Sequence, residues 1–339
     1  MARVATNKTL QQARKAKSDE FYTRLADIEK ELKHYRQHFK DKVVLCNCDD
    51  PRVSNFFHFF SYNFEKLGLK KLITTCYKSQ NMDLFSRHDD EAAIYLEYEG
   101  DKNDNKVPDP EEIGIQHLQG DGDFRSPECI ELLKQADIVV TNPPFSLFRE
   151  YVGQLIEHQK KFLVVGTWNA ITYRDIFKLI QSDSLWIGVN SNRNFSGFIV
   201  PEHYPLHGTE ARLDEHGNRV VSSNNTCWFT NLENAKRHED LPLFRTFDAE
   251  EHPEYDNYHA IEVNQVVNIP VDYDGVMGVP ITFLNKYNPE QFEIVGSDAD
   301  VKEGLLPELV KSSWDGKIDR AYLNGKRMYA RLFIRRKSA

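Results

Sequence analysis

The segment Asn142-Pro143-Pro144-Phe145 combines residues that could hold a planar amine for a chemical reaction. Two successive prolines fix the backbone and donate no hydrogen bonds, so the loop is stiff and its carbonyl oxygens can accept. The side-chain oxygen of Asn142 and the Pro143 carbonyl form a pair of acceptors, which suits an exocyclic amino group with two N–H donors. Phe145 could stack on the ring that carries this amine. The pattern favours binding of an aromatic amine, although Asn-Pro is also a common turn starter.

The elements that must position this segment form an alternating pattern of short strands and helices. Apolar runs typical of strands lie at 43–48, 72–76, 113–118, 137–141, 162–166 and 185–189. Helical spacing and capping residues mark 17–39, 56–67, 128–134, 147–158 and 173–181. The alternation predicts the α/β class, with a parallel sheet covered by helices on both faces. Residues 97–112 are polar and acidic, which indicates a surface loop.

Three unusual groups of residues follow directly after expected strands. Asp49-Asp50-Pro51 follows the strand at 43–48, Asp121 and Asp123 follow the one at 113–118, and Asn142 follows the one at 137–141. Ligands of parallel sheets bind beyond the carboxyl ends of the strands. We therefore expect these groups to meet in one site. After residue 190, strand-like runs at 198–201, 227–231 and 281–284 predict a continuing sheet edge and then an irregular or β-rich module.

Basic residues concentrate at both ends of a chain whose net charge is −9. Residues 1–17 contain five basic and no acidic side chains, and residues 317–339 contain eight basic side chains and one acidic one. Basic ends on an acidic body can contact a polyanion locally while the whole protein stays acidic. Arg14, Lys15 and Lys17 are candidates for such contacts, although chain ends are often charged simply because they are solvated.

The C-terminal basic stretch has the pattern of a β-hairpin. Asn324-Gly325 is a strong signal for a two-residue turn. In the strand expected after it, Met328, Ala330, Leu332 and Ile334 share one face, and Arg327, Tyr329, Arg331, Phe333 and Arg335 share the other. The second face, basic with interleaved aromatic residues, predicts contact with nucleic acid. The alternative is an edge strand whose arginines prevent aggregation.

The composition excludes several classes of protein. With 40% hydrophobic and 28% charged residues, the chain is not collagen-like, a coiled coil or wholly disordered. No stretch approaches the roughly 18 apolar residues of a membrane span, and the first residues lack the apolar core of a secretion signal. Five cysteines fit a reducing compartment, so we expect a cytoplasmic protein without membrane contact. Cys46 and Cys48 lack a second pair of ligands, so no metal site is expected.

The segment 142–145 resembles the (Asp/Asn/Ser)-Pro-Pro-(Tyr/Phe) motif of amino-methyltransferases that use S-adenosylmethionine. Over nearly its full length the chain resembles one family among them, the EcoRI-type adenine-specific DNA modification methyltransferases. This likeness rests on residues 17–23, 46–56, 120–126, 141–148, 197–204 and 274–283. It implies a Rossmann-like S-adenosylmethionine-dependent methyltransferase sheet followed by a C-terminal target-recognition region.

The resemblance also implies roles for individual residues. Asn142, Pro143, Pro144 and Phe145 match the catalytic motif. The implied cofactor-binding residues are Phe21 and Thr23 for the methionine part, Asp49, Asp50 and Pro51 in the first cofactor motif, and Asp121, Asp123 and Phe124 for the adenosyl part. The chain departs from the family pattern at two points. Residues 52–55 replace the usual Gly-rich loop, and Cys76-Tyr77 stands where an acid for the ribose hydroxyls is expected.

The implied activity is methyl transfer to the N6 amine of an adenine that is flipped out of duplex DNA. We expect a basic arm at 1–17, a catalytic domain at 18–235 and a target-recognition region at 236–339, with Arg327, Arg331 and Arg335 on DNA phosphates. Phe195 and Phe198 could supply a second stacking surface or could simply be core residues. A monomer suffices for this activity. GAATTC, the site of the type member, is the expected target, and a restriction endonuclease sharing the site is a partner that the sequence leaves open.

Two other classes of function stay open from the sequence. The first is methylation of adenine in RNA or of an amide on a protein, since related enzymes share the Asn-Pro-Pro motif. A glutamine-methylating enzyme, however, should have a Gly-rich first motif. The second is a DNA-binding protein without activity on the same fold, against which the intact segment 142–145 argues.

Overall fold

The computed structural model describes residues 22–48, 54–75, 93–105, 108–109, 112–191, 195–200, 211–214, 217–221 and 225–337. The chain forms two compact units, one of residues 1–176 and 187–232 and the other of residues 177–186 and 233–339. Several residues singled out from the sequence lie outside the described ranges: Arg14, Lys15, Lys17, Phe21, Asp49, Asp50, Pro51, Cys76 and Tyr77. The functions assigned above to three regions of the chain stay predictions.

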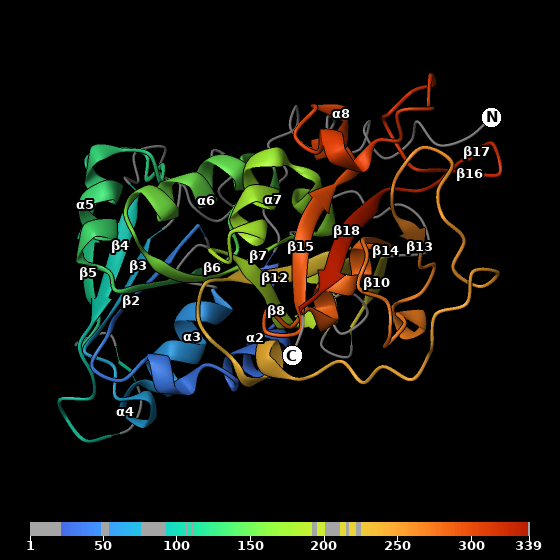
Figure 1. The fold of residues 1–339 in the computed structure, drawn as a ribbon. Coiled ribbons are helices and arrows are strands. Elements are labelled where there is room, and N and C mark those ends of the chain that lie inside the picture. The colour runs from blue at the N-terminus through green and yellow to red at the C-terminus, as the bar shows by residue number, and fades with distance from the viewer. Residues whose placement is uncertain are drawn as a thin grey trace. The chain divides into compact units, whose positions relative to one another are not determined.

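The first unit is built on an eight-stranded sheet (Figure 1). Its strand order is β5-β4-β3-β2-β6-β7-β12-β8. The strands are β2 (Val43–Asn47), β3 (Lys71–Thr75), β4 (Ile94–Tyr98), β5 (Gly114–His117), β6 (Ile138–Thr141), β7 (Lys161–Thr167), β8 (Trp186–Ser191) and β12 (Thr226–Thr230). Neighbours among β3, β2, β6 and β7 run parallel, whereas β4, β5 and β12 pair antiparallel with their partners. The predicted α/β class with a parallel central sheet is confirmed.

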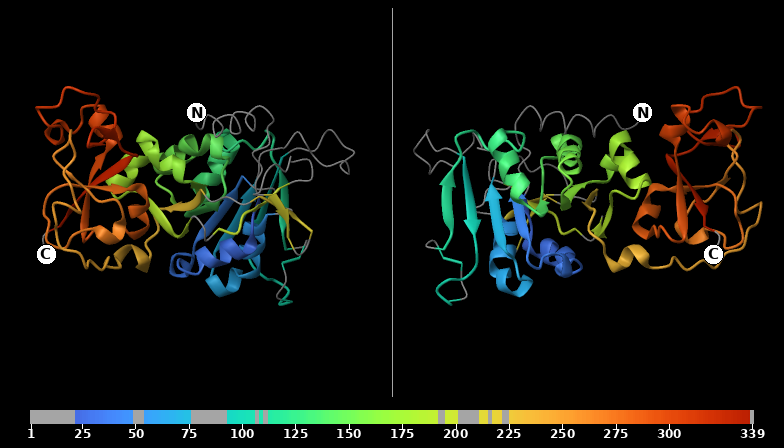
Figure 2. Two further views of the ribbon diagram at one scale, coloured as in Figure 1. Left: turned by 90° about the vertical axis from the view of Figure 1, so that its right-hand side faces the viewer. Right: turned by 60° about the vertical axis from the view of Figure 1, so that its left-hand side comes forward.

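Helices cover both faces of this sheet (Figure 2). On one face lie α5 (Pro127–Gln135) and α6 (Phe148–Glu157), and on the other lie α2 (Leu25–Leu32), α3 (Asn55–Tyr62) and α4 (Phe64–Leu67). Strands β2 and β6 are wholly buried, as strands between two helical layers must be. Phe56 and Phe60 of α3 pack with Ile28 of α2 into the core that includes Val44 and Val140.

Capping explains where the helices begin. The Ser54 hydroxyl accepts hydrogen bonds from the backbone N–H groups of Phe56 and Phe57, and Ser126 accepts from Cys129 N–H, with Pro127 in the first helical position. The helix expected over 56–67 is divided into α3 and α4 at Asn63, whose Nδ2 donates to the Phe59 carbonyl at 2.8 Å. α4 ends at Gly68, which has a φ of 64°.

Two expectations for the first unit need correction. Within the helical segment expected over 17–39, the described residues begin with a strand, β1 (Tyr22–Thr23), and α2 starts only at Leu25. Strand β1 exists because it pairs with β9 (Phe198–Ile199), which is far along the chain. These strands form a second sheet in the order β1-β9-β11-β10, with β10 at Ala211–Leu213 and β11 at Arg219–Val221. Strand β4 was not expected, and it includes Glu97 and Tyr98, the first two residues of the loop expected over 97–112.

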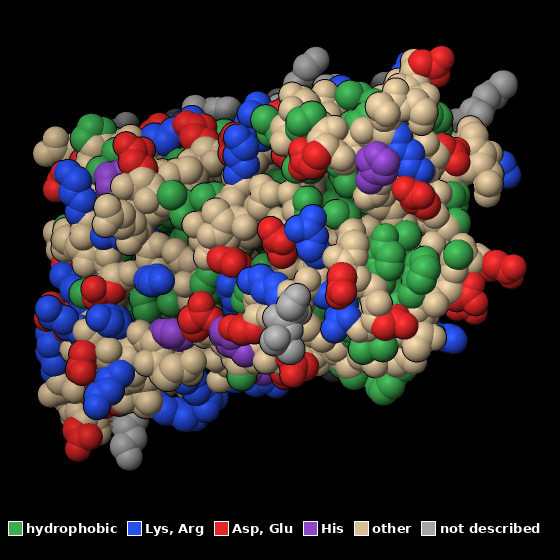
Figure 3. Space-filling view, in the orientation of Figure 1, with side chains coloured by type: hydrophobic (Ala, Val, Ile, Leu, Met, Phe, Trp, Pro, Cys, Tyr) green, Lys and Arg blue, Asp and Glu red, His purple; other side chains and the backbone are tan. Residues whose placement is uncertain are grey.

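The second unit has its own sheet, in the order β13-β14-β18-β15. The strands are β13 (Ile261–Glu262), β14 (Met277–Pro280), β15 (Phe292–Ser297) and β18 (Arg331–Arg336), and α8 (Asp298–Lys302) follows β15. Tyr255, Tyr258 and Phe333 lie in its core. Apolar side chains also gather on part of the surface of this unit (Figure 3). Among the large apolar residues of the unit, Phe244 and Val267 are exposed. The strand expected over 281–284 is wrong, because Ile281–Lys286 form a 3₁₀ helix.

The predicted C-terminal turn is confirmed. Tyr322–Leu323 (β16) pairs antiparallel with Lys326–Arg327 (β17), and Asn324 and Gly325 have φ angles of 51° and 72°. Such a pair of left-handed residues makes a two-residue hairpin turn.

The predicted basic strand face is wrong at Arg331 and Phe333. The regular strand β18 begins only at Arg331, and it lies between β14 and β15. All four residues from Arg331 to Ile334 are buried, because both faces of this central strand are covered. Arg327, Tyr329 and Arg335 are exposed, as predicted.

No helix in the described part of the chain is long and apolar enough to cross a membrane.

Candidate active site

The segment 142–145 leaves the sheet at the carboxyl end of β6. Asn142 follows Thr141 directly and is 7% exposed. Strand β6 pairs in parallel with β2 through Val44↔Ile138 and Leu45↔Val139, so Asn47 and Thr141 lie at the same edge. The chains leaving β2 and β6 are therefore neighbours. The expected meeting of the first and fourth strand ends is confirmed as far as Cys48, the last described residue after β2.

Cys48 turns the chain sharply at the end of β2. Its φ is 86°, a left-handed conformation that a non-glycine residue seldom adopts, and its N–H donates to the Thr75 carbonyl at 3.0 Å. Asn47 before it accepts a hydrogen bond from the Tyr151 hydroxyl of α6. Burial raises the pKa of Tyr151 well above its ordinary value, so this phenol stays a neutral donor. α6 is thereby tied to the carboxyl end of β2.

The 119–126 turn brings Phe124 to the same edge. Glu128 at the start of α5 accepts from the N–H groups of Gln119 and Gly120, at 2.9 and 2.7 Å, which holds the turn in place. Phe124 is buried and packs edge to face on Tyr151, with ring centroids 5.0 Å apart. The predicted residue Phe124 is therefore joined through Tyr151 to the end of β2.

The acid pair before Phe124 is partly engaged within the turn. Asp123 accepts from the Arg125 side chain through Nε at 2.8 Å and Nη2 at 2.6 Å. These bonds lower the pKa of Asp123 below its ordinary value. Asp121 is exposed, and its Oδ1 accepts from the Asp123 N–H at 3.1 Å. Asp123 is thus an ionised acceptor beside Phe124 at neutral pH, and Asp121 offers further carboxylate oxygens next to it.

Phe145 begins the 3₁₀ helix η2 (Phe145–Leu147) and packs against a cluster of aromatic residues. Its ring lies edge to face on Phe198 of β9, with centroids 5.9 Å apart. Phe195 in turn contacts Phe198 at 5.7 Å and Trp228 at 5.8 Å. Phe195 and Phe198 are both buried in the core of the first unit. Of the two alternatives left open for these residues, the core position is what the structure shows, and Phe198 supports Phe145 from the core side.

The pairing of β1 with β9 brings Thr23 to this aromatic cluster. Thr23 is the register partner of Phe198, and its carbonyl accepts from Asn55 Nδ2 at 2.8 Å. The Thr23 side chain is 1% exposed, and its Oγ1 makes no hydrogen bond within the described part of the chain. A buried hydroxyl left in this state is a ready partner for a polar ligand.

Three residues at this edge were not singled out from the sequence: Asn47, Tyr151 and Asn55. Asn47 and Asn55 lie inside the segment 46–56 that carries the family likeness, so their position next to a strand end was the available signal. Tyr151 had no signal of its own, because a tyrosine at a helical core position is usually structural. Together with Thr23, Phe124, Asn142 and Phe145, they offer hydrogen-bond acceptors, hydroxyl groups and aromatic rings at one edge of the sheet. This arrangement can hold a planar amine against a second, adenosyl-like ligand.

The predicted DNA-contacting arginines divide into two kinds. Arg327 and Arg335 are exposed, with ion pairs to Asp319 at 2.7 Å and to Glu293 at 3.7 Å. Arg331 is 8% exposed, and its guanidinium donates two hydrogen bonds to the Glu262 carboxylate, from Nη2 at 2.6 Å and from Nε at 3.0 Å. A side chain that is buried and fully paired in this way cannot reach a phosphate, so Arg331 no longer counts among the DNA-contacting residues.

The chain matches the family described as adenine-specific methyltransferase EcoRI over residues 9–337. It is 53% identical over 339 residues to the Type II methyltransferase M.EcoRI of Escherichia coli, and the alignment covers 99% of both chains. It is 39% identical to the Type II methyltransferase M.MgeORF184P of Mycoplasma genitalium, over 96% of this chain and 97% of that one. The Type II methyltransferase M.MpnI of Mycoplasma pneumoniae is 38% identical over the same shares. No solved structure gives a significant match.

Proposed function

Because this chain belongs to the EcoRI-type adenine-specific methyltransferases, we propose that it transfers a methyl group from S-adenosylmethionine to the N6 amine of adenine at a specific sequence in duplex DNA. The observation that carries the proposal is the position of Asn142 and Phe145. They lie at the carboxyl end of β6, next to the end of β2 and to the Phe124 turn. The acceptor pair for the amine and the residues proposed for the cofactor thus share one sheet edge.

In the proposed mechanism, Asn142 and the Pro143 carbonyl accept hydrogen bonds from the two N–H groups of the target amine. These bonds draw the nitrogen lone pair out of conjugation with the ring and aim it at the methyl group. Phe145, held from behind by Phe198, stacks on the flipped base. The N–C bond would form as the S–C bond breaks, the sulfur would leave with that electron pair as a neutral thioether, and the amine would release its proton to solvent. Most of the acceleration comes from orientation and electrostatics, since no covalent enzyme intermediate is needed.

The residues around β2 fit S-adenosylmethionine, which supplies the electrophilic methyl group when bound. Asp121 and Asp123 offer acceptors for amino and hydroxyl groups, and Phe124 offers an apolar contact beside them. The buried Thr23 hydroxyl offers a hydrogen bond to the methionine part. Phe21, Asp49, Asp50 and Pro51 belong to the proposed site by resemblance alone.

The test is transfer of labelled methyl from S-adenosylmethionine to plasmid DNA, followed by mapping of N6-methyladenine at base resolution. We expect label at a single recurrent sequence. GAATTC is the expected sequence because M.EcoRI is 53% identical to this chain over its full length. Label on RNA or protein in place of DNA would overturn the choice of substrate. A protein that binds the cofactor but labels none of the three would overturn the proposed activity.

The second unit and the basic N-terminal arm are proposed to contact DNA, with Arg327 and Arg335 on phosphates. Phosphate contacts give affinity without sequence information, so other residues of the region from about 236 onward must read the bases. A monomer in the cytoplasm suffices, because the two strands of a symmetric site can be modified in turn. A restriction endonuclease that cuts the same sequence is the proposed biological counterpart, and it need not touch this enzyme.

Neutralising both exposed arginines, Arg327→Gln with Arg335→Gln, is expected to weaken DNA binding without altering which sequence is methylated. Each lost phosphate contact lowers the slope of log affinity against log salt by roughly 0.9, so the slope should fall by about 2. The measurement is DNA affinity by fluorescence anisotropy at several salt concentrations. Lys134→Gln is the matched control, because Lys134 is also exposed and ion-paired, with Glu131, but lies on α5. An unchanged slope in the double variant would show that neither arginine contacts a DNA phosphate.

A further inference from the structure

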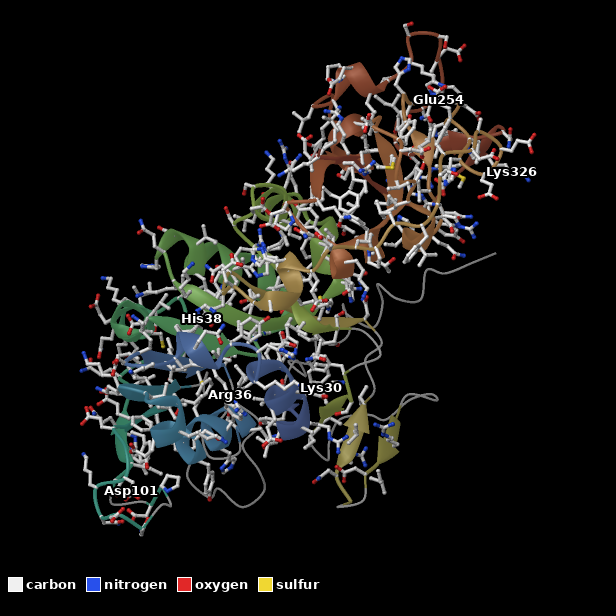
Figure 4. All side chains as sticks on the ribbon, turned by 60° about the horizontal axis from the view of Figure 1, so that its bottom comes forward. Lys30, Arg36, His38, Asp101, Glu254 and Lys326 are labelled. Atoms are coloured by element: carbon white, nitrogen blue, oxygen red, sulfur yellow. The ribbon has the colours of Figure 1, made fainter. Side chains whose placement is uncertain are left out.

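Helix α2 carries two buried carboxylates one turn apart, Asp27 and Glu31 (the helix is marked by Lys30 in Figure 4). Asp27 is 5% exposed and Glu31 is fully buried. Residues four apart share one face of a helix, so both side chains point into the same interior region. Buried carboxylates are uncommon unless they are paired, because burial removes the hydration that stabilises their charge. Their partners therefore indicate what they do.

Glu31 binds the end of strand β8. Its Oε1 accepts from the Val189 N–H at 2.7 Å, and its Oε2 accepts from the Asn190 N–H at 2.7 Å and from Asn190 Nδ2 at 2.9 Å. The Tyr35 hydroxyl donates to Oε1 at 3.0 Å. Burial raises the pKa of Glu31, and the hydrogen bonds from Asn190 and Val189 oppose this shift. All four partners are donors, so the geometry suits an ionised carboxylate with both oxygens occupied.

Asp27 binds the chain just before strand β9. Its two oxygens accept from the Ser196 N–H at 3.1 and 3.0 Å, and Oδ2 also accepts from the Ser196 hydroxyl at 2.7 Å. The two carboxylates therefore hold the chain at Val189–Asn190 and at Ser196, which are the two sides of the connection from β8 to β9. These contacts join segments about 160 residues apart in the sequence, all within the first unit.

The chain held in this way carries the aromatic residues behind the proposed base pocket. Phe195 precedes Ser196, and Phe198 follows two residues later. Phe198 is the ring on which Phe145 packs, and Phe195 wedges between Phe198 and Trp228. Phe198 also pairs with Thr23 across β1 and β9. A shift of Ser196 or Asn190 would therefore be passed to Phe198 and from there to Phe145.

We propose that Asp27 and Glu31 are positioning residues for methyl transfer, which fix the chain on both sides of the β8–β9 connection so that Phe198 holds Phe145 against the flipped adenine. The proposal rests on the function proposed above and adds two residues to it that touch neither substrate nor cofactor. Carboxylates suit this task because each collects several donors from a distant segment. In an asparagine or glutamine of the same shape, an NH₂ group replaces one carboxylate oxygen. That group would face N–H donors and could not accept a hydrogen bond from them.

Gly188 supports the proposed role of Glu31. A Cβ added at this glycine of β8 would lie 2.4 Å from Glu31 Oε1 and 2.6 Å from the Cβ of Trp228. The carboxylate thus lies directly over the glycine, in space that any side chain at position 188 would take. Gly188→Ala is expected to displace Glu31 without touching its chemistry, so it should reproduce the effect of Glu31→Gln.

The experiment compares Glu31→Gln and Asp27→Asn with the wild type in single-turnover methylation at saturating DNA and S-adenosylmethionine. We expect the transfer rate to fall by about 10- to 100-fold, since a misplacement of about 1 Å can cost that much. The affinity for S-adenosylmethionine should stay within about twofold. Fluorescence of 2-aminopurine at the target position, which reports an unstacked base, should change in parallel with the rate. Asp137→Asn is the control, because Asp137 also accepts a backbone N–H, from Val43, but lies at the amino edge of the sheet. The Asp137→Asn variant should transfer the methyl group at the wild-type rate.

A double-mutant cycle separates positioning from general stability. If the carboxylates act through Phe145, Glu31→Gln should slow transfer by less than about twofold in a Phe145→Leu background. The effects of substitutions at interacting residues are not additive. An equal loss in both backgrounds, or a loss of cofactor affinity that matches the loss of rate, would overturn the proposal. Ser196→Ala removes a single contact of Asp27 and serves where the acid variants do not fold. It should slow transfer a few-fold and show the same dependence on Phe145.

Failure of the inference and failure of the proposed function have different outcomes. If the wild type methylates DNA and both acid variants match its rate, the inference alone is wrong. If the wild type neither labels DNA adenine nor changes the 2-aminopurine signal, the proposed function is wrong and the inference falls with it.

Discussion

Asn142→Ala is expected to lower the rate of methyl transfer by roughly 100- to 1000-fold or more, the usual cost of removing one hydrogen-bonding group that acts in a transition state. Asn142 lies directly after β6 and is almost completely buried, so its side chain has little freedom to move. Without the amide oxygen, the target amine loses one of its two acceptors, and its lone pair stays conjugated with the ring. The measurement is single-turnover transfer to a short duplex that contains the recognised sequence.

Cofactor binding provides the discriminating control for Asn142→Ala. The residues proposed for S-adenosylmethionine belong to the β2 end, the Phe124 turn and Thr23, so a titration of the variant with the cofactor should give nearly the wild-type affinity. DNA affinity should also change little, because most of it comes from phosphate contacts. Wild-type turnover in the variant would refute the role of Asn142. A parallel loss of cofactor affinity would show that Asn142 supports the fold of the site and not the reaction.

The order of elements in the first unit could be predicted because its strands are short, apolar and buried on both sides. Such strands are recognisable as continuous runs of apolar residues. The observed bounds of β2, β6 and β7 lie within a residue or two of those expected from the sequence. Strand β1 could not be predicted in this way. It has only two residues, and it exists through its partner β9, which lies about 175 residues later. Local patterns carry no information about a partner at that distance.

The candidate site shows the same division between local and distant information. Asn142 and Phe145 were identifiable because their chemistry is contained in four consecutive residues. Asp27 and Glu31 look like ordinary polar positions of an amphipathic helix, and their burial depends on donors from Val189, Asn190 and Ser196. A sequence pattern can show which residues share a face of an element. It cannot show which faces other segments will cover.

Arg331 illustrates this limit on the basic strand. Alternation along a strand correctly predicts that Arg331, Phe333 and Arg335 share one face. The basic residues on this face suggested that it is exposed to solvent. The structure buries the first two, because β18 is a central strand of its sheet and Glu262 lies opposite Arg331. The acid that neutralises Arg331 comes from β13, 69 residues earlier in the chain. Arg335 lies one residue before the end of β18 and is exposed.

Arg331→Ala is therefore expected to destabilise the second unit by about 3–5 kcal/mol, the usual cost of leaving a buried charge without its partner. Both carboxylate oxygens of Glu262 face the Arg331 guanidinium, and the Tyr255 hydroxyl donates to Oε2 as well. Removal of Arg331 leaves Glu262 buried with the tyrosine alone. Hydrogen exchange of peptides from β14, β15 and β18 is the appropriate measurement, because a chain of two units need not unfold in a single step.

Two further variants make the Arg331 prediction specific to the buried pair. Arg335→Ala removes an exposed arginine from the same strand, 3.7 Å from Glu293, and should cost no more than about 1 kcal/mol. The double variant Arg331→Met with Glu262→Leu removes both charges and should recover most of the lost protection, because apolar residues of similar volume commonly replace a buried ion pair without penalty. The Gly278 carbonyl, 3.4 Å from the Tyr255 hydroxyl, then remains as an acceptor for that tyrosine. Equal exchange in the Arg331 and Arg335 variants would mean that the buried pair contributes no more to stability than the exposed one.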